Sequence, residues 1–216
     1  MSDSTNSLRP LWALLAAFAA VWIGWAVLLV LNPATLGADA PGAIVLRNAV
    51  RLAVWGGAAV GFARLAKKRP ALEYLRLRGA WRGAALAGLA SLAWAGGALL
   101  FKGGIGGLSL NDWLTAILCA PPVEEMLFRG VVFQELAAHW TGRAGVWRAA
   151  AVSALLFAAI HAPYWYLSGS RSGLTLLADL ASVAALGLLF ALALRRTGSL
   201  WSAIFLHMAN NFAASL

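Results

Sequence analysis

Long apolar runs are the feature that most restricts what this chain can fold into. The first run, from Leu11 to Leu31, contains no charged residue, and further runs of similar length follow it. A hydrocarbon core of about 30 Å needs about 20 apolar residues as helix, because a helix satisfies its own backbone hydrogen bonds in lipid. The sequence therefore predicts an all-α, polytopic transmembrane helical bundle. We expect about seven spans: 11–31, 44–65, 83–101, 112–137, 147–166, 174–194 and 199–215.

The composition excludes several classes of protein. Hydrophobic residues make up 62% of the 216 residues and charged residues only 12%, which is too apolar for a soluble domain. The single cysteine, Cys119, excludes an internal disulfide framework and a cysteine-based zinc site. The formal charge is +9, but the basic residues cluster beside apolar spans. We therefore expect the lipid bilayer as partner and no nucleic acid.

The basic residues predict the orientation of the bundle. The connection 66–82 is rich in Lys and Arg, whereas the connection 32–42 contains neither. Because positive loops stay inside, the loop 66–82 and the N-terminus are predicted to be cytoplasmic. The chain then divides into three N-terminal transmembrane helices over 1–109 and a helical core over 110–216.

Ionisable residues at membrane depth point to function, since each costs roughly 2.5–3.5 kcal/mol on insertion scales. The segment "LCAPPVEEMLFRG" places Glu124, Glu125 and Arg129 in the fourth span. Pro121 and Pro122 predict that a new helix begins there, with both carboxylates in its first turn. Glu125 and Arg129 are four residues apart and can pair, while Glu124 lies about 100° away and stays available as a general base.

Two later spans carry the remaining polar side chains. "FAAIH" places Phe157 and His161 on one helix face, and "HMANN" places His207 and Asn211 on one face. Counted from the cytoplasmic helix ends, these groups and Glu124 lie at overlapping depths of about 12–20 Å. One shared cavity would supply water activation and oxyanion stabilisation. Taken singly, each group is equally consistent with a buried ion cluster or an interhelical hydrogen bond.

The three motifs "EEMLFR", "FAAIH" and "HMANN", in this order on successive predicted spans, resemble those of the CPBP family. This family comprises type II CAAX prenyl proteases together with bacteriocin-processing and self-immunity (Abi) proteins. The resemblance covers about residues 110–216. It implies a membrane-embedded helical core and an intramembrane endopeptidase activity.

The resemblance also implies roles for individual residues. Glu124 would activate the attacking water with help from His161, and His207 with Asn211 would stabilise the oxyanion. No cofactor is favoured, although zinc held by Glu124, His161 and His207 is the metal-dependent alternative. Three further residues would shape the site: Glu125, Arg129 and Phe157.

The composition and the charge asymmetry are typical of a bacterial inner membrane protein. The resemblance implies a protein or peptide substrate with a membrane-anchored segment. The depth of Glu124 and His161, about 20 Å from the cytoplasmic ends, favours cleavage toward the periplasmic face. No motif predicts an oligomeric state.

Two other functions are consistent with the same residues. A non-proteolytic membrane scaffold or bacteriocin self-immunity protein would use the buried polar cluster for structure or partner binding. A transporter or proton relay would also place carboxylates and histidines at depth. Arg47, Arg51 and Asp179 have no role in the protease hypothesis, and we expect Asp179 to neutralise one of the two arginines.

Overall fold

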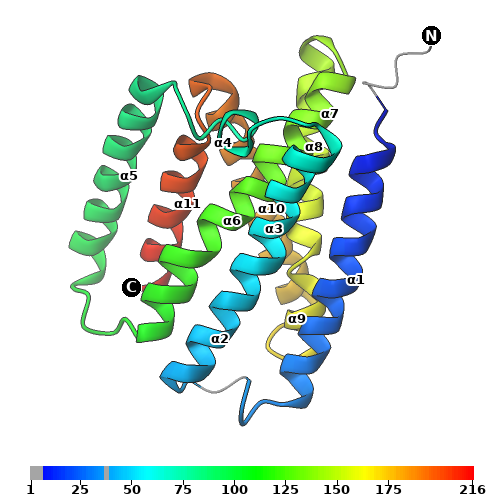
Figure 1. Ribbon diagram of the computed structural model, residues 1–216. Helices are drawn as coiled ribbons and strands as arrows, with labels where there is room; N and C mark the ends of the chain where they lie inside the picture. Colours follow the sequence, from blue (N-terminus) through cyan, green and yellow to red (C-terminus); the bar gives the residue numbers. More distant parts are fainter. Residues whose placement is uncertain (1–6, 37–38) are drawn as a thin grey trace.

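The computed structural model describes residues 7–36 and 39–216, and every regular element in these ranges is helical (Figure 1). Two long rods are each built from consecutive α- and π-helical segments, and the other elements are α-helices. The first rod contains α2 (Pro41–Arg51), η2 (Leu52–Gly56), α3 (Gly57–Gly61) and η3 (Phe62–Ala66). The second contains η4 (Asp112–Cys119), α6 (Ala120–Leu127), η5 (Phe128–Phe133) and α7 (Gln134–His139). The α-helices are α1 (Arg9–Leu31), α4 (Ala71–Tyr74), α5 (Trp81–Lys102), α8 (Gly142–Ala159), α9 (Ala162–Leu167), α10 (Gly173–Thr197) and α11 (Leu200–Ser215).

The polytopic helical bundle is confirmed. Within the described ranges, five helices are long and apolar enough to cross a membrane: Arg9–Leu31, Pro41–Ala66, Trp81–Lys102, Gly142–Leu167 and Gly173–Thr197. The other two predicted spans are also helical. One is the second rod, which carries the buried charges, and the other is α11, which has only 16 residues. A total of seven spans and the positions of the termini stay predictions.

The second rod occupies the middle of the bundle and passes through the two prolines without a break (Figure 1). The α-helical segment α6 does begin at Ala120, with the two prolines in its first turn as predicted, but it continues the turns of η4 instead of starting a separate helix, and its first turn contains no acidic residue. Cys119, just before α6, keeps helical backbone angles (φ −95°, ψ −42°). The wider π-helical turns of η4 accommodate the proline rings and their missing N–H groups. Glu124 and Glu125 thus lie inside a continuous rod rather than at an exposed helix start.

The packing follows from the position of this rod. In it, α6 contacts η2, η4 and α11, while η5 contacts α8. Trp55, Leu127 and Phe128 are almost completely buried at these contacts. The outer helix α5 instead exposes large apolar side chains, such as Leu100 at 87% and Phe101 at 94%. Such a surface is stable where lipid replaces water, so the apolar exterior agrees with a membrane location.

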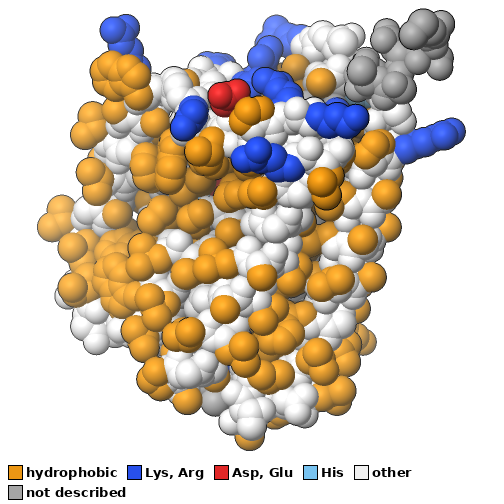
Figure 2. All heavy atoms as spheres, viewed as in Figure 1, with side chains coloured by type: hydrophobic (Ala, Val, Ile, Leu, Met, Phe, Trp, Pro, Cys, Tyr) orange, Lys and Arg blue, Asp and Glu red, His pale blue; other side chains and the backbone are white. Residues whose placement is uncertain are grey.

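Lys and Arg side chains gather at the end of the bundle that contains α4 and the start of α1 (Figure 2). This end includes the basic loop 66–82. Tyr74 donates a hydrogen bond to Glu135 Oε1 (2.7 Å), and Lys67 Nζ lies 2.6 Å from Glu135 Oε2. Burial, and then the Glu135 carboxylate, raise the pKa of Tyr74. These contacts fix the basic loop to the second rod.

Asp179 does not neutralise an arginine of the first rod, so this prediction is wrong. Its carboxylate lies 2.5 Å from Arg171 Nε, and both side chains are partly exposed (38% and 47%). Arg171 lies in the loop just before α10, at the same end of that helix, and is therefore the nearer cation. Arg47 and Arg51 need another explanation.

Candidate active site

The predicted ionisable residues converge inside the bundle from three parts of the chain. Glu124, Glu125 and Arg129 come from the second rod, and His207 comes from α11. All four are buried, with exposed fractions of 6%, 0%, 0% and 5%. His161 follows the end of α8 and precedes α9. The bundle therefore brings together the carboxylates and the two imidazoles that the sequence predicted to share one site.

Glu125 connects Arg129 to His207. Its Oε1 accepts a hydrogen bond from Arg129 Nη1 (2.9 Å) and lies 2.8 Å from His207 Nδ1. The first contact has the predicted four-residue spacing, whereas the second joins residues 82 positions apart. A carboxylate beside Nδ1 favours the tautomer with hydrogen on Nδ1. The other ring nitrogen, Nε2, then faces Glu124, with 3.8 Å between Nε2 and Oε2.

The Glu124 carboxylate differs from that of Glu125. Within residues 7–36 and 39–216, no hydrogen bond is made to Glu124, and His207 is its ion-pair neighbour at 3.8 Å. Glu124 lines a cavity of about 360 Å³. A buried carboxylate with a purely structural role would also accept hydrogen bonds from the surrounding chain. Glu124 is instead positioned to interact with what enters the cavity.

Aromatic rings surround the charged groups. The Phe157 ring lies edge-on to His161 (5.1 Å between centroids) and to His207 (5.7 Å). Arg129 Cζ lies 4.2 Å from the centroid of Phe157 and 5.4 Å from that of Phe190. Phe190, on α10, also stacks on His207. The rings stabilise the guanidinium by cation–π contact, although Arg129 Nε and Nη2 have no hydrogen-bond partner in the described chain.

Gly187 on α10 leaves the space that Arg129 occupies. A Cβ atom at Gly187 would lie 2.7 Å from Arg129 Nη2 and 3.2 Å from Ala154 Cβ. We expect Gly187→Ala to displace Arg129 and to lower the free energy of unfolding by about 1–3 kcal/mol. Thermal unfolding in detergent measures this effect. Gly96→Ala on α5, where no atom lies within 4 Å of the added Cβ, is the matched control and should not be destabilised. Equal stability of the two variants would contradict the packing described here.

His161 and Asn211 are held differently. His161 Nδ1 lies 2.9 Å from the Phe157 carbonyl, which favours hydrogen on Nδ1 and leaves Nε2 without hydrogen in the neutral ring. His161 lines the same cavity as Glu124. Asn211 Nδ2 donates to the Ala116 carbonyl (2.8 Å) and Asn211 is not among the residues that line the cavity. The structure thus places Glu124 and His161 on one cavity and Asn211 against the backbone of η4.

The remaining cavity residues were not expected from the sequence. Aromatic side chains form much of the wall, among them Trp22, Trp55, Tyr164 and Trp165. Trp165 follows His161 by four residues, and its ring lies 5.1 Å from the imidazole, so helical spacing could have indicated it. No sequence signal places Trp22 or Trp55 there, because they come from α1 and the first rod.

As their side chains lie, the residues of the predicted zinc set do not form a metal site in the part of the chain that the structure describes. Among the residues that the structure describes, no group of three or more His, Cys, Asp and Glu side chains could hold a metal ion. The predicted zinc set consists of Glu124, His161 and His207. A tetrahedral zinc site would require ligand atoms of all three side chains to surround one position. We therefore derive no step through a metal.

Comparison with known protein families identifies a related family. A family model described as type II CAAX prenyl endopeptidase Rce1-like matches residues 106–213. This range is half of the 216 residues and contains Glu124, His161, His207 and Asn211. Neither the curated proteins nor the solved structures give a match.

Proposed function

Because the chain belongs to the type II CAAX prenyl endopeptidase Rce1-like family, and is thus an intramembrane protease of the CAAX type, we propose that it cleaves its substrate with water activated by Glu124. The family match also confirms the resemblance to the CPBP family. One observation carries the proposed mechanism: the buried Glu124 carboxylate lines the cavity and makes no hydrogen bond to the described chain.

The proposed reaction begins with a water molecule between Glu124 and His161. Glu124 takes a proton from the water while Nε2 of His161 accepts the other O–H, which orients the oxygen. The oxygen attacks the carbonyl carbon of the peptide bond, and the carbonyl oxygen becomes an oxyanion. Glu124 then passes its proton to the leaving nitrogen as the C–N bond breaks. The products are a carboxylic acid and an amine.

The oxyanion needs donors, and we assign them to His207 and Asn211. When His207 is doubly protonated, Nδ1 donates to Glu125 and Nε2 is free to donate to the oxyanion. Asn211 has a second amide hydrogen besides the one that it gives to Ala116. Arg129 supports this arrangement through Glu125, with which it forms a buried ion pair.

The substrate class follows from the location of the site. We propose a membrane-associated protein or peptide, because the buried carboxylate is reached from the cavity within the bundle. A test uses the purified protein in liposomes with a degenerate mixture of short, lipid-anchored peptides. New peptide termini, detected by mass spectrometry, are the expected result. No new termini in any peptide would contradict a protease.

The glutamate mechanism predicts that metal removal has no effect. Each proposed step uses only side chains of this chain and water. Peptide cleavage in liposomes should therefore continue at the same rate with a strong chelator. Loss of cleavage that added zinc restores would overturn the mechanism and favour zinc bound by Glu124, His161 and His207.

We further propose that the cavity opens toward the periplasm of a bacterial inner membrane. Its walls include residues of α9, which lies at the end of the bundle opposite the basic α4 loop (Figure 1), and Asn111, just before η4. A Cys119→Ala, Asn111→Cys variant should react with a membrane-impermeant thiol reagent added outside intact spheroplasts. Arg78→Cys in the basic loop is the matched control and should react only after lysis. Reaction of residue 111 only after lysis would reverse the assignment.

A further inference from the structure

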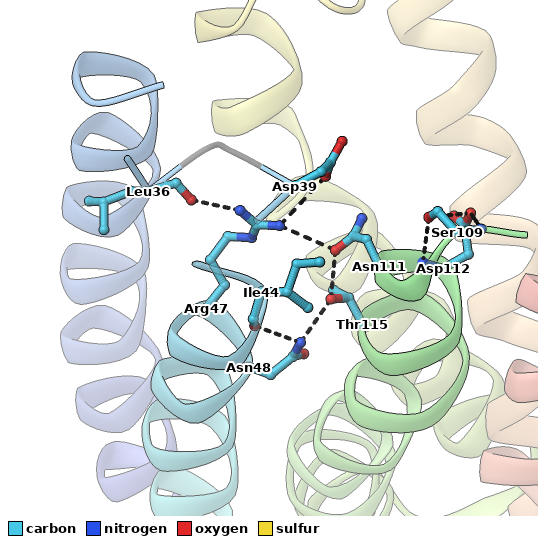
Figure 3. A network of polar contacts seen from close by, with 9 residues as sticks. All are labelled: Leu36, Asp39, Ile44, Arg47, Asn48, Ser109, Asn111, Asp112 and Thr115. Carbon is cyan, nitrogen blue, oxygen red and sulfur yellow. Dashed lines mark hydrogen bonds and ion pairs between the residues drawn. The ribbon is translucent and has the colours of Figure 1, made fainter. Parts of the chain in front are cut away.

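Arg47 and Arg51 lie four residues apart on the first rod, and among the described residues they differ in their polar partners. Its Nη1 donates to the Leu36 carbonyl (2.7 Å) and its Nη2 to Asn111 Oδ1 (3.3 Å), as Figure 3 shows. Asp39 Oδ1 lies 3.9 Å from Arg47 Nη2. Arg47 therefore clamps the loop after α1 to the start of the second rod, and it has a structural role.

Arg51 lies one helical turn further along the rod and has no such partners among the residues that the structure describes. Its Nε is buried without a hydrogen-bond acceptor, and no ion pair to Arg51 exists within the described ranges. Its Cζ lies 5.8 Å from the centroid of Trp22, a weak cation–π contact. A cation at membrane depth is energetically costly unless a partner compensates its charge, and such residues mark functional sites. The described part of the chain does not supply this partner.

Arg51 and Glu124 line the same cavity. A guanidinium presents its N–H donors in a planar fork that matches the two oxygens of a carboxylate. Trp22, Trp55 and Trp165 provide apolar walls around it. A cavity of about 360 Å³ holds a short stretch of peptide, so a group bound at Arg51 lies close to the bond that Glu124 attacks.

We propose that Arg51 binds a carboxylate of the peptide substrate, so that the preferred substrates carry a carboxylate a short distance from the scissile bond. This inference rests on the proposed function and names a feature of its substrates. The carboxylate belongs either to the C-terminus of the peptide or to an Asp or Glu side chain. In both cases the contact with Arg51 offsets the repulsion between the substrate anion and Glu124.

Binding tests this proposal without cleavage. The protein with Glu124→Gln is immobilised in detergent and incubated with three degenerate mixtures of short peptides. One mixture has free C-terminal carboxylates and no Asp or Glu, one has C-terminal amides and no Asp or Glu, and one has C-terminal amides and a single Asp. Mass spectrometry counts the retained peptides. We expect about tenfold or greater enrichment of at least one carboxylate mixture over the neutral mixture, and the mixture that is enriched identifies the carboxylate.

Variants of Arg51 decide whether this residue is responsible. In the Glu124→Gln background, Arg51→Gln should reduce the enrichment to less than about twofold, since a single charged hydrogen-bond pair accounts for it. Arg51→Lys should keep part of the enrichment of the carboxylate mixture. Arg64→Gln is the matched control, because Arg64 is exposed on the same rod and outside the cavity, and it should keep all of it.

Three results would overturn the proposal. The first is equal retention of acidic and neutral peptides by the Glu124→Gln protein. The second is an unchanged preference in Arg51→Gln. The third is an equal loss of acidic and neutral peptides in both Arg51 variants, which would make Arg51 a structural residue. Cleavage by the unmodified protein is measured separately. Selective binding without cleavage would contradict the protease proposal and keep the carboxylate site. Cleavage without selective binding would keep the protease proposal and contradict the carboxylate site.

Discussion

Glu124→Gln should lower the rate of peptide cleavage by about 10²–10⁴-fold, the range that a general base contributes. Glutamine has nearly the same shape as glutamate but cannot take a proton from water. The fold should tolerate the change, because no hydrogen bond in the described chain depends on the Glu124 carboxylate. Initial rates with the lipid-anchored peptide mixture in liposomes measure the loss, and thermal unfolding confirms that the variant is folded.

Glu73→Gln is the control for this experiment. Glu73 is an exposed acid in the basic loop and lies outside the cavity. The Glu73→Gln variant should cleave the peptides at the rate of the unmodified protein. A folded Glu124→Gln variant that cleaves as fast as the Glu73 control would show that Glu124 is not the base.

Arg129→Met should destabilise the bundle by about 3–5 kcal/mol, the usual effect of breaking a buried ion pair. Arg129 is completely buried and is the ion-pair partner of Glu125. Methionine fills a similar space between Phe157 and Phe190 but leaves the Glu125 carboxylate without a cation. Glu125 Oε2 already lacks a hydrogen-bond partner in the described chain, and the His207 ring is then the one polar group left beside Oε1 there. Unfolding in denaturant, followed in detergent micelles, measures the change.

The double variant Glu125→Gln, Arg129→Met makes the interpretation specific. If the effect comes from an uncompensated charge, the double variant should be more stable than Arg129→Met alone. Arg64→Gln, which removes an exposed arginine, should change the stability little. An Arg129→Met variant as stable as this control would contradict a structural role for the buried pair.

Local spacing predicted part of the site. The four-residue separation of Glu125 and Arg129 gave their contact, and the separation of Phe157 and His161 gave their common face. Contacts between helices could not be predicted in this way, since they depend on how the helices rotate and pack. The bond between Glu125 and His207 and the stacking of Phe190 on His207 are of this kind.

Other features depended on backbone geometry that the sequence pattern does not report. The two prolines predicted a helix start, but π-helical turns before them keep the second rod continuous. The positions of the long apolar helices were predicted well, because hydrophobic length follows directly from the bilayer. The first predicted span, 11–31, lies within α1 (Arg9–Leu31). Asp179 was paired wrongly because Arg171, in the adjacent loop, lies closer in space.

The central claim is that Glu124 serves proteolysis in the membrane. The most direct measurement compares protein termini, by mass spectrometry of membrane and secreted fractions, between cells with the intact protein and cells with equal amounts of a folded Glu124→Ala variant. The proposed function predicts termini near the end of a substrate's membrane segment that occur only with the intact protein. Identical termini in both strains would contradict it and favour a scaffold or self-immunity role for the buried cluster.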